Sequence, residues 1–567
     1  MKKAIKSKLF IIPFLFLITF GIFMALTYMV VSKLKYPMSL MNWETAAEIS
    51  AAVSALLILM RFHGSKKREY KDIEQGSARW GKKKDMALYT DKNFQSNIIL
   101  SSEEFLSMNM RKTHRDCHVL VIGGSGSGKS RFYALPNIMQ MNASYVITDP
   151  SGEHLLNEGK MLEEHGYKVK VFNVVDMENS LHFNPFHYYK EPEDIIRFVE
   201  LFIANTSGSK SQNTSEDMGF WKNCEKLWFM AHIAYIQETC IEEEKNLNSL
   251  VLLLNNSETR EEDEDYKSPV DVLFDELEEQ NPDSFAVKQY KKYKLAAGKT
   301  AKSILISVGV RLANFDIPKL AHLVDDDELE LEKIGDKKTA LFIIVSDTDK
   351  TYNYIAAILL DVLFKTLSKR ADSQPEHHLK IPVRCILDEI ANIGYFPDLH
   401  ILIAVLRKRW IDLEMLFQNV NQLKALYKDN WATIEGNCDT TVFLGGKGED
   451  TTKYVSNDLL GKATIDTFSQ GGGGTASSLG QNSYNFSNQK TGRNLLDETE
   501  VARLKDDECI VSIRGLPPFK SKKYNPEKHE NYKLLADSNS KNAYHFHRGL
   551  DKKNADIEYV TLNLQGE

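Results

Sequence analysis

The chain has 567 residues, of which 43% are hydrophobic and 26% are charged, and its formal net charge is −7. This length allows two or three domains, and the composition is that of an ordinary globular protein. The negative balance excludes a molecule that is basic overall, so contact with nucleic acid would need a local basic patch. The six cysteines are scattered without a CxxC pair, which argues against a zinc knuckle or a disulfide framework and favours a reducing compartment.

The chain begins with a predicted membrane anchor at residues 1–64. Residues 9–31 form a run of 23 residues without a charge, and lysines precede and follow this run. About 20 apolar residues suffice to cross a bilayer, whereas the apolar part of a cleaved signal peptide has only about 7–15. We therefore predict a transmembrane helix at 9–31.

A second, weaker span is predicted at residues 46–62. Its uncharged core, 49–60, has only 12 residues and Glu48 lies at its start, so its length would also fit a buried core helix. Basic residues at 66–71 match those before the first span, and this is the charge bias of two cytoplasmic flanks. The pattern predicts a multi-pass protein of the cell membrane whose main domains lie in the cytoplasm.

The remaining chain alternates between strand-like and helical patterns. Short β-branched runs at 117–122, 143–148 and 169–175 are typical of buried parallel strands, and similar runs return at 339–345 and 383–387. Apolar residues between about 191 and 332 follow helical spacing instead. We expect an α/β domain, with a mainly parallel sheet covered by helices on both faces, that is interrupted by an all-α domain. The predicted bounds are 65–187 and 336–520 for the two α/β parts, 188–335 for the all-α insertion and 521–567 for a C-terminal tail.

Two segments of biased composition complete this outline. Residues 258–283 carry a dozen acidic side chains, which is typical of a solvated loop or helix face. Residues 469–489 are rich in glycine, serine and asparagine, and we interpret them as a mobile loop. The tail has no strong pattern.

A phosphate-binding loop follows the strand at 117–122. The segment fits G-x-x-x-x-G-K-[ST] in full, and its glycines allow successive backbone N–H groups to turn inward around a phosphate. The lysine would neutralise the β- and γ-phosphates, and the last hydroxyl would ligate Mg²⁺. We therefore predict ATP and Mg²⁺ as ligands, and the cytosolic location of ATP agrees with the predicted topology. The loop residues are Gly123, Gly124, Ser125, Gly126, Ser127, Gly128, Lys129 and Ser130.

A pair of acids ends the strand at 383–387. Asp388 would hold the magnesium shell, and Glu389 would act as the general base for the attacking water. Asp149 also ends a strand, but it lacks an adjacent acid and is interpreted as a supporting group. No LSGGQ-like or NKxD-type segment is present, so an ABC ATPase or a GTPase is disfavoured. The long separation between Lys129 and Asp388 is explained by the inserted domain.

Two further polar residues follow the acid pair. An arginine one helix beyond the metal acid, such as Arg407, can reach the γ-phosphate bound by a neighbouring subunit in a ring. A glutamine after a strand, such as Gln418, can sense the same phosphate. Surface arginines and glutamines are common, so the alternative that neither has a role stays open.

Several segments together resemble the coupling proteins of conjugation and type IV secretion, a family of membrane-bound hexameric motors related to FtsK-like translocases. The resemblance covers most of the chain, and the DEIANIG and RGLPP segments are its most specific parts. The segments are the paired spans, GSARW at 76–80, the P-loop, DPSGE at 149–153, FNP at 183–185, LDEIANIG at 387–394 and IRGLPP at 513–518.

This resemblance implies a RecA-like nucleotide domain, a homo-hexamer, and ATP-driven transfer of relaxase-bound single-stranded DNA, with its accessory proteins, to the subunits of a type IV secretion channel. It also implies that Arg407 is an arginine finger and Gln418 a sensor, and that both are catalytic together with Glu389. Trp410 departs from the glycine found in many relatives and puts the local turn in doubt. The short tail favours a Gram-positive mobile element as the source.

Other functions remain open at this point. The chain could be a receptor ATPase that hands over protein effectors only, which a basic, aromatic-lined pore would disfavour. The direction in which the lysines at 291–299 face would bear on this. A chromosome-partition translocase would be expected to carry a C-terminal DNA-reading domain, and no such pattern is present.

Overall fold

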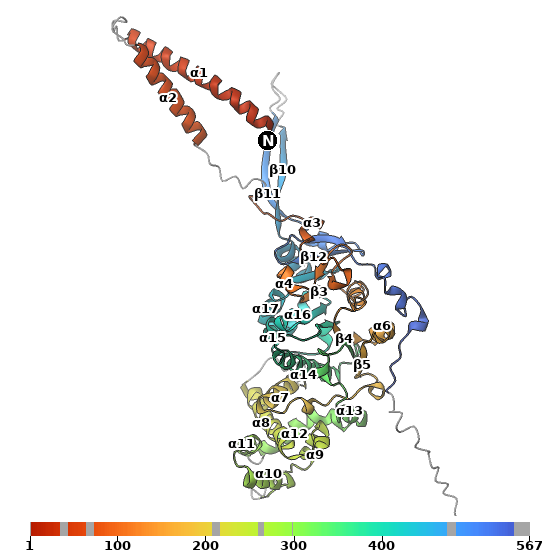
Figure 1. Cartoon of the computed structure of the whole chain (residues 1–567). Coiled ribbons are helices and arrows are strands. Elements are labelled where there is room, and N and C mark those ends of the chain that lie inside the picture. The colour runs from red at the N-terminus through yellow and green to blue at the C-terminus, as the bar shows by residue number, and fades with distance from the viewer. Residues whose placement is uncertain are drawn as a thin grey trace, which may run out of the picture. The chain divides into compact units, whose positions relative to one another are not determined.

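The computed structural model describes residues 2–33, 43–63, 73–206, 216–258, 266–296, 299–472 and 484–548. The chain divides into two compact units (Figure 1). The first comprises Met1–Ser77 and Thr464–Lys490, and the second comprises Ala78–Ala463 and Thr491–Glu567.

Two N-terminal helices lie side by side in the first unit, α1 (Lys2–Lys33) and α2 (Trp43–His63) (Figure 1). Among the described residues, only α1 contains a segment, Phe16–Lys33, that is long and apolar enough to cross a membrane. Two spans were predicted, but only one of the described helices has this length and hydropathy. The physical reason is that α2 carries Glu44 and Glu48 in its first two turns, which lowers its hydropathy.

A two-stranded antiparallel ribbon contributes to the first unit. Its strands are β10 (Lys462–Gly472) and β11 (Tyr484–Asn494). The prediction of a mobile loop at 469–489 is wrong at its two ends, because β-ladder pairing overrides the low strand propensity of glycine, serine and asparagine there. Residues 473–483 lie outside the described residues.

The second unit is built on a nine-stranded mixed sheet with the order β13-β12-β9-β3-β8-β7-β4-β6-β5. The strands from β9 to β5 pair in parallel, and β12 and β13 join antiparallel at one edge. The bounds are β3 (Val119–Ile122), β4 (Ser144–Pro150), β5 (Lys168–Asn173), β6 (Thr339–Val345), β7 (Val383–Leu387), β8 (Ile411–Phe417), β9 (Thr440–Phe443), β12 (Glu508–Ile513) and β13 (Phe519–Lys522).

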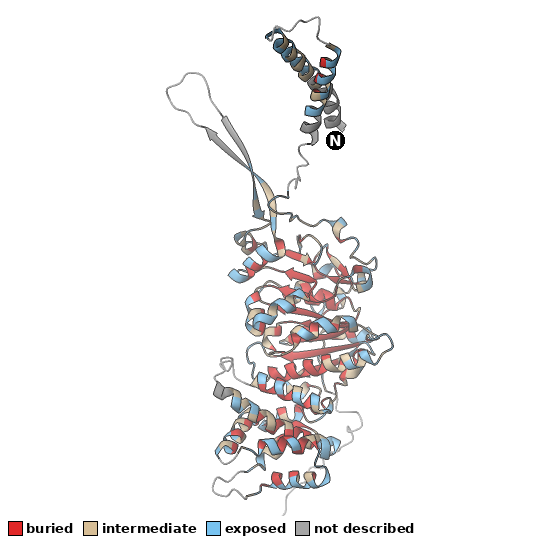
Figure 2. Ribbon diagram, turned by 90° about the vertical axis from the view of Figure 1, so that its left-hand side faces the viewer, coloured by how far each residue is buried: buried red, intermediate tan, exposed pale blue. Residues whose placement is uncertain are grey.

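The sheet is buried on both faces, as its continuous apolar strands predict. Leu120 and Ile122 of β3 join one hydrophobic core, whereas Val119 and Val121 join another, because side chains alternate across a strand. Helices α14, α15 and α16 contribute to the first core, and α5 and α6 contribute to the second. Figure 2 shows the resulting band of buried strands between partly exposed helices. The α/β class and the mainly parallel sheet are confirmed.

The helices and short strands around the sheet are mostly brief. They are α3 (Lys83–Met86), α4 (Met110–Thr113), α5 (Leu135–Ile138), α6 (Glu153–Glu164), α14 (Asn353–Asp372), α15 (Leu399–Leu406), α16 (Val420–Tyr427), α17 (Trp431–Gly436), α18 (Glu449–Tyr454) and α19 (Glu498–Ala502), together with the strand pair β1 (Asn97–Ile99) and β2 (Phe105–Ser107).

Between β5 and β6 the described residues form helices and no strand. This order is what an all-α insertion at 188–335 requires, although the predicted bounds remain a prediction. The helices are α7 (Pro192–Thr206), α8 (Glu216–Thr239), α9 (Leu247–Asn255), α10 (Pro269–Gln280), α11 (Phe285–Tyr293), α12 (Lys299–Leu312) and α13 (Pro318–Leu323).

The acidic segment of this region is partly neutralised within the same region. Helix α10 falls inside the predicted block at 258–283, of which residues 259–265 lie outside the described residues. Lys291 pairs with Glu278, and Lys294 pairs with Asp271 at 2.8 Å. These two lysines therefore face the acidic helix.

The chain after β13 follows the surface of the sheet domain up to Arg548. The backbone N–H of Ala536 donates to the carbonyl of Asn157 at 3.3 Å, and that of Tyr544 donates to Leu156 at 2.9 Å. The ring of Tyr544 fits against Gly159, where a Cβ would lie 2.6 Å from the ring. Packing against α6 thus orders a segment whose own sequence has no strong pattern, whereas residues 549–567 lie outside the described residues.

Candidate active site

The glycine-rich loop leaves the carboxyl end of β3 near the middle of the sheet. Gly126 and Gly128 have φ values of +74° and +79°, which favour glycine. A Cβ on Gly123 would lie 2.3 Å from Oγ of Ser127, and one on Gly128 would lie 2.4 Å from the ring of Phe132. The loop therefore requires its glycines, and its curled backbone has the form that cradles a phosphate.

The two residues that end the loop lie at the base of this cradle. Lys129 is only 7% exposed, and its Nζ donates to the carbonyl of Gly123 at 3.2 Å. Ser130 Oγ donates a hydrogen bond to Oδ2 of Asp388. The fold thus brings together the predicted loop and the predicted metal acid, although 258 residues separate Ser130 from Asp388 in the sequence.

Asp388 follows β7 and is almost completely buried, with 2% of its surface exposed. Its Oδ1 is buried and has no hydrogen-bond partner among the described residues. Burial opposes its ionisation, but His154, Ser130 and Lys129 outweigh this effect and hold the pKa of Asp388 below its usual value. An ionised carboxylate with a free oxygen beside a serine hydroxyl is a donor set that suits Mg²⁺.

Glu389 is held by hydrogen bonds to both of its carboxylate oxygens. Nε2 of Gln418 donates to Oε1 at 3.0 Å, and Nδ2 of Asn392 donates to Oε2 at 2.8 Å. Gln418 reaches it because β8, which ends at Phe417, lies between β3 and β7 in the sheet. The predicted base and the predicted sensor are therefore in direct contact, between the P-loop strand and the acid strand.

Arg407 lies at the edge formed by the amino ends of the parallel strands, opposite the edge formed by their carboxyl ends. It precedes β8, which runs parallel to β3, so it belongs to the edge where β3 begins and the phosphate loop to the edge where β3 ends. β8 has seven residues, which separates the two edges by roughly 20 Å. The charge of Arg407 accordingly acts on Asp116 and His118, both of which precede β3. The structure thus does not bring Arg407 together with the other site residues of the same chain.

The turn after Arg407 resolves the doubt about Trp410. Trp410 adopts the left-handed conformation, with φ at +61°, that glycine would adopt most easily. Its indole stacks on the imidazole of His378, with ring centroids 3.5 Å apart and planes 16° from parallel. The turn is formed as a glycine would form it, and the stacking offsets the backbone cost.

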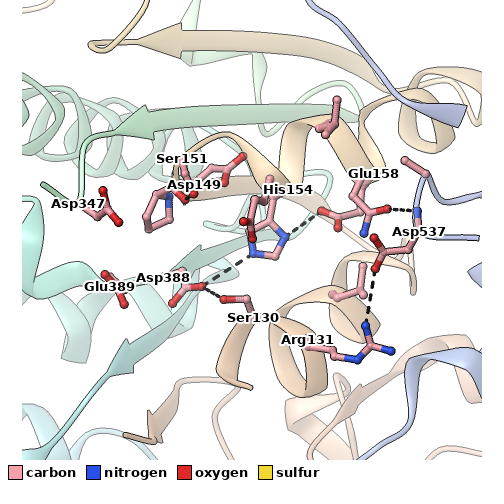
Figure 3. A pocket seen from close by; sticks show the side chains of 16 residues that line it. Ser130, Arg131, Asp149, Ser151, His154, Glu158, Asp347, Asp388, Glu389 and Asp537 are labelled. Atoms are coloured by element: carbon pink, nitrogen blue, oxygen red, sulfur yellow. Dashed lines mark hydrogen bonds and ion pairs between the residues drawn. The ribbon is translucent and has the colours of Figure 1, made fainter. Parts of the chain in front are cut away.

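His154 and Glu158 are site residues that the sequence reasoning missed. Nδ1 of His154 lies 3.0 Å from Oε2 of Glu158, and its Nε2 lies 3.9 Å from Oδ2 of Asp388 (Figure 3). Burial lowers the pKa of His154, but the neighbouring carboxylates outweigh it and raise that pKa well above its usual value. Burial raises the pKa of Glu158 to about 7. The available signal was their four-residue spacing directly after Glu153, which places both on one helix face.

Asp149, the alternative metal acid, has a different position. It is fully buried, and its Oδ2 accepts a hydrogen bond from the backbone N–H of Leu155 at 2.8 Å. This bond fixes Asp149 to the first turn of α6, so it supports the site from one side.

A cavity of about 640 Å³ is bordered by six of the residues described above, Ser130, Asp149, His154, Glu158, Asp388 and Glu389 (Figure 3). It extends from Ser130 and Glu389 along α6 to Asp537 of the C-terminal segment. The carboxylates around it are Asp149, Glu153, Glu158, Asp347, Asp388, Glu389 and Asp537. Such a set repels phosphate on its own and requires a divalent cation to accompany it, so the residues present fit a magnesium nucleotide.

A second cavity has a volume of about 630 Å³. It is lined by Phe132 and Lys523 among others, and Nζ of Lys523 donates to the carbonyl of Ser127 at 2.8 Å. Burial lowers the pKa of Lys523. The predicted tail thus supplies a second support of the phosphate loop, which the sequence did not indicate.

Comparison with known proteins places the chain in a family. The family described as "Type IV secretory system Conjugative DNA transfer" matches residues 67–543. Conjugal transfer protein TraG of Rhizobium radiobacter is 22% identical over 418 residues, which are 71% of this chain and 61% of TraG. Protein VirD4 of the same organism is 24% identical over 420 residues, which are 72% of this chain and 56% of VirD4. The matched region thus spans about 60% of these curated relatives.

Solved structures show the same fold. The bacterial conjugative coupling protein TrwBdeltaN70 superposes with a TM-score of 0.57 at 16% identity, over 80% of this chain and 93% of that chain. TrwB in complex with ADP and Mg²⁺ superposes with a TM-score of 0.56 at 16% identity, over 81% and 97% of the two chains. With the family match covering most of its length, the chain belongs to the type IV secretory system conjugative DNA transfer family.

Proposed function

We propose that this protein is a membrane-anchored ATPase that recruits relaxase-bound single-stranded DNA and drives it to a type IV secretion channel. The observation that carries the proposal is the contact of Ser130 with Asp388 beside the contact of Glu389 with Gln418. Phosphate loop, metal acid, base and sensor meet at one edge of the sheet, in a chain whose family is named for conjugative DNA transfer.

The site residues have separable tasks in this proposal. The loop backbone and Lys129 would hold the phosphates, and Ser130 and Asp388 would hold Mg²⁺, which supplies charge neutralisation on the leaving phosphate. Glu389 would take the proton of the attacking water. The hydrogen bonds from Gln418 and Asn392 fix the direction of both carboxylate oxygens of Glu389, and Gln418 links that carboxylate to the strand beside the P-loop.

The proposed assembly is a homo-hexamer with a RecA-like arrangement of nucleotide sites between subunits. Its support is the position of Arg407, which lies at the far edge of its own sheet and therefore has a use in hydrolysis only at a neighbour's nucleotide. In this arrangement each site takes its loop from one subunit and its arginine from the next.

The proposed membrane anchor is the α1–α2 hairpin, with both ends in the cytoplasm. Helix α2 buries Ala46, Ser50 and Ser54, at a spacing of four residues. Small residues in this pattern are typical of closely packed membrane helices, which supports α2 as a second span despite its lower hydropathy. A cysteine introduced at Met38 should react with an impermeant reagent in intact cells, whereas one at Gln75 should not. The reverse pattern would exclude the hairpin.

The decisive test of function is ATP hydrolysis by the purified full-length protein in detergent. We expect turnover that single-stranded DNA stimulates severalfold and that Lys129→Ala abolishes. Turnover without any response to single-stranded DNA, but with a response to a secreted protein substrate, would favour the receptor for protein effectors. No turnover under either condition would contradict the ATPase itself.

A further inference from the structure

The connections between the sheet domain and the helical insertion meet at a neck formed by two short segments. One contains His182 and Phe183, and the other runs from Leu323 to Glu328. The backbone N–H of Phe183 donates to the carbonyl of Leu323, and that of Glu328 donates to the carbonyl of His182, both at 3.0 Å. Glu328 Oε2 also accepts from the backbone N–H of His182 at 2.9 Å. The neck is therefore a fixed part of the fold.

Three metal-ligating side chains converge on this neck. Nδ1 of His182 lies 3.0 Å from Oδ1 of Asp325, and Nδ1 of His322 lies 2.7 Å from Oδ2 of the same carboxylate. One donor atom from each of the three residues lies within 4.8 Å of the others. Ligands around a tetrahedral zinc ion are roughly 3.4 Å apart, since the bonds are about 2.1 Å long. The group therefore needs only small side-chain adjustments to hold one ion.

The orientation of these atoms favours a shared partner over a hydrogen bond between His182 and Asp325. Oδ1 of Asp325 is buried and makes no hydrogen bond among the described residues, although Nδ1 of His182 is only 3.0 Å away. His182 is 3% exposed, whereas the His322 side chain is 67% exposed. The site thus has one buried ligand and one exposed ligand, with access from solvent.

A cationic side chain, Arg548, already contacts one residue of this cluster. The guanidinium of Arg548, at the end of the described C-terminal segment, contacts Nε2 of His182 and lies 3.5 Å from Nδ1. It also donates to Oε1 of Glu328 at 3.1 Å. Of the four consecutive acids at residues 325–328, Asp325 contacts His182 and Glu328 contacts Arg548. The cluster therefore attracts positive charge, and the tail supplies it in this structure.

Arg548 and a metal ion make opposite demands on His182. Arginine has only donors, so its contact with Nε2 leaves the imidazole proton on Nδ1. A metal bound through Nδ1 displaces that proton, and the neutral ring then carries its proton on Nε2, facing the guanidinium. Without Arg548, Glu328 would be free to accept from Nε2–H, as carboxylates commonly do behind metal-bound histidines.

We propose that His182, His322 and Asp325 form a binding site for a divalent transition-metal ion at the neck of the insertion, and that metal binding displaces Arg548 of the C-terminal segment. Imidazole nitrogens with one carboxylate suit Zn²⁺, Co²⁺ or Ni²⁺ better than Mg²⁺. The ligands come from both sides of the neck, so the ion would join its two segments and release the C-terminal segment at the same time. The proposal is independent of ATP hydrolysis.

The test is Co²⁺ binding to the purified full-length protein without nucleotide, followed by its visible absorption and by calorimetry. We expect one ion per chain with the spectrum of nitrogen and oxygen ligation. Since loss of a group that only orients a ligand costs roughly 10–100-fold in metal affinity, His322→Ala should weaken binding at least that much. His322 is exposed, so this variant should fold normally. The matched control is His165→Ala, which removes another exposed histidine and should leave binding unchanged.

A second variant tests the exchange with the tail. Arg548→Ala removes the competing guanidinium, so it should bind Co²⁺ several times more tightly than the natural chain. Equal affinity in His322→Ala and the natural chain would overturn the site, and the binding would then be adventitious. Unchanged affinity in Arg548→Ala would overturn the displacement of the tail.

Discussion

The two edges of the main sheet carry opposite halves of the proposed hydrolysis machinery. At the carboxyl edge, Ser130 is hydrogen-bonded to Asp388, and Gln418 is hydrogen-bonded to Glu389. At the amino edge, Arg407 lies near Asp116, which is paired with Asp439. Arg514 of the RGLPP segment forms an ion pair with Asp439. The first edge carries the proposed nucleotide-binding residues without the proposed arginine finger, and the second carries the proposed finger without these residues.

In the proposed hexamer, one chain therefore supplies two half-sites and not one whole site. A parallel sheet places the carboxyl ends of its strands at one edge, so residues that follow strands meet there. A residue that precedes a strand lies at the other edge, whatever its chemistry. Proximity in sequence, as between Arg407 and Gln418, therefore does not bring residues together across a strand.

The largest expected effect is that of Arg407→Ala, which tests whether the residues at the two edges act together. We expect retained ATP binding and assembly, with hydrolysis lowered by roughly 10³–10⁵, because a finger stabilises charge that develops only in the transition state. Mixing with Lys129→Ala should partly restore turnover, since a Lys129→Ala subunit can supply Arg407 to a neighbour with an intact loop. If mixed rings are demonstrated and activity never exceeds that of either parent, the action between subunits is refuted.

At the carboxyl edge, Glu389→Gln sharpens the assignment of the base. The amide keeps the shape and one acceptor for Gln418 but cannot take a proton, so ATP should bind normally while turnover falls roughly 10²–10⁴-fold. Nucleotide binding by fluorescence and single-turnover hydrolysis measure the two quantities separately. Normal turnover would assign the base to another carboxylate of the cavity, and Glu153 would be examined next.

The acid pair at the amino edge predicts a pH effect on stability. Burial, followed by the charge of Asp439, raises the pKa of Asp116 to about 7. An acid whose pKa is raised by folding stabilises the fold fully below its unfolded value, about 3.9, and this contribution is lost as the pH rises to about 7. In Asp116→Asn this part of the pH dependence should disappear, a difference of at least about 1 kcal/mol between pH 4 and 7.

Chemical denaturation of both proteins at several pH values measures this effect. Asparagine can still accept the hydrogen bonds that the backbone N–H groups of His118 and Asp439 donate to Oδ1 of Asp116. The pKa of Asp439 is lowered: burial opposes this, but Arg514 outweighs it. The contribution of Asp439 therefore has the opposite sign. Parallel pH profiles would show that Asp116 is ionised across this range.

The smallest expected effect concerns the turn that carries Arg407. Trp410→Gly keeps the left-handed conformation but removes its cost, about 1–2 kcal/mol in residues other than glycine, and it loses stacking worth about 0.5–1.5 kcal/mol. The two terms nearly cancel, so stability should change by less than about 1 kcal/mol. Trp410→Ala keeps the backbone cost and loses the stacking, so it should be the less stable of the two. The reverse order in thermal unfolding would show that the stacking on His378 has no stabilising role.

The sequence determined much of the nucleotide-binding half. The spacing of Gly123, Gly128 and Lys129 is a local property of the backbone, and so are strands that end at Asp149 and Asp388. Continuous apolar strands predicted a sheet buried on both faces. Local patterns of this kind are readable because the same few residues form the feature.

Other features depended on pairing between distant segments. Glycine and serine predicted a loop at 469–489, whereas ladder pairing between β10 and β11 extends strands into both ends of that segment. The tail shows no pattern of its own, yet it lies along α6 because Gly159 leaves room for Tyr544. Composition could not indicate either result, since the partner lies elsewhere in the chain.

Tertiary structure alone decided which residues share an edge of the sheet. Strand order put β8 between β3 and β7, and so placed Gln418 against Glu389, while strand direction put Arg407 about 20 Å away. His182 lies far from His322 and Asp325 in the sequence. The three converge only because both segments that connect the insertion to the sheet domain pass through one neck. The amino-acid sequence determined the chemistry of each group, and the topology of the sheet determined which groups can act together.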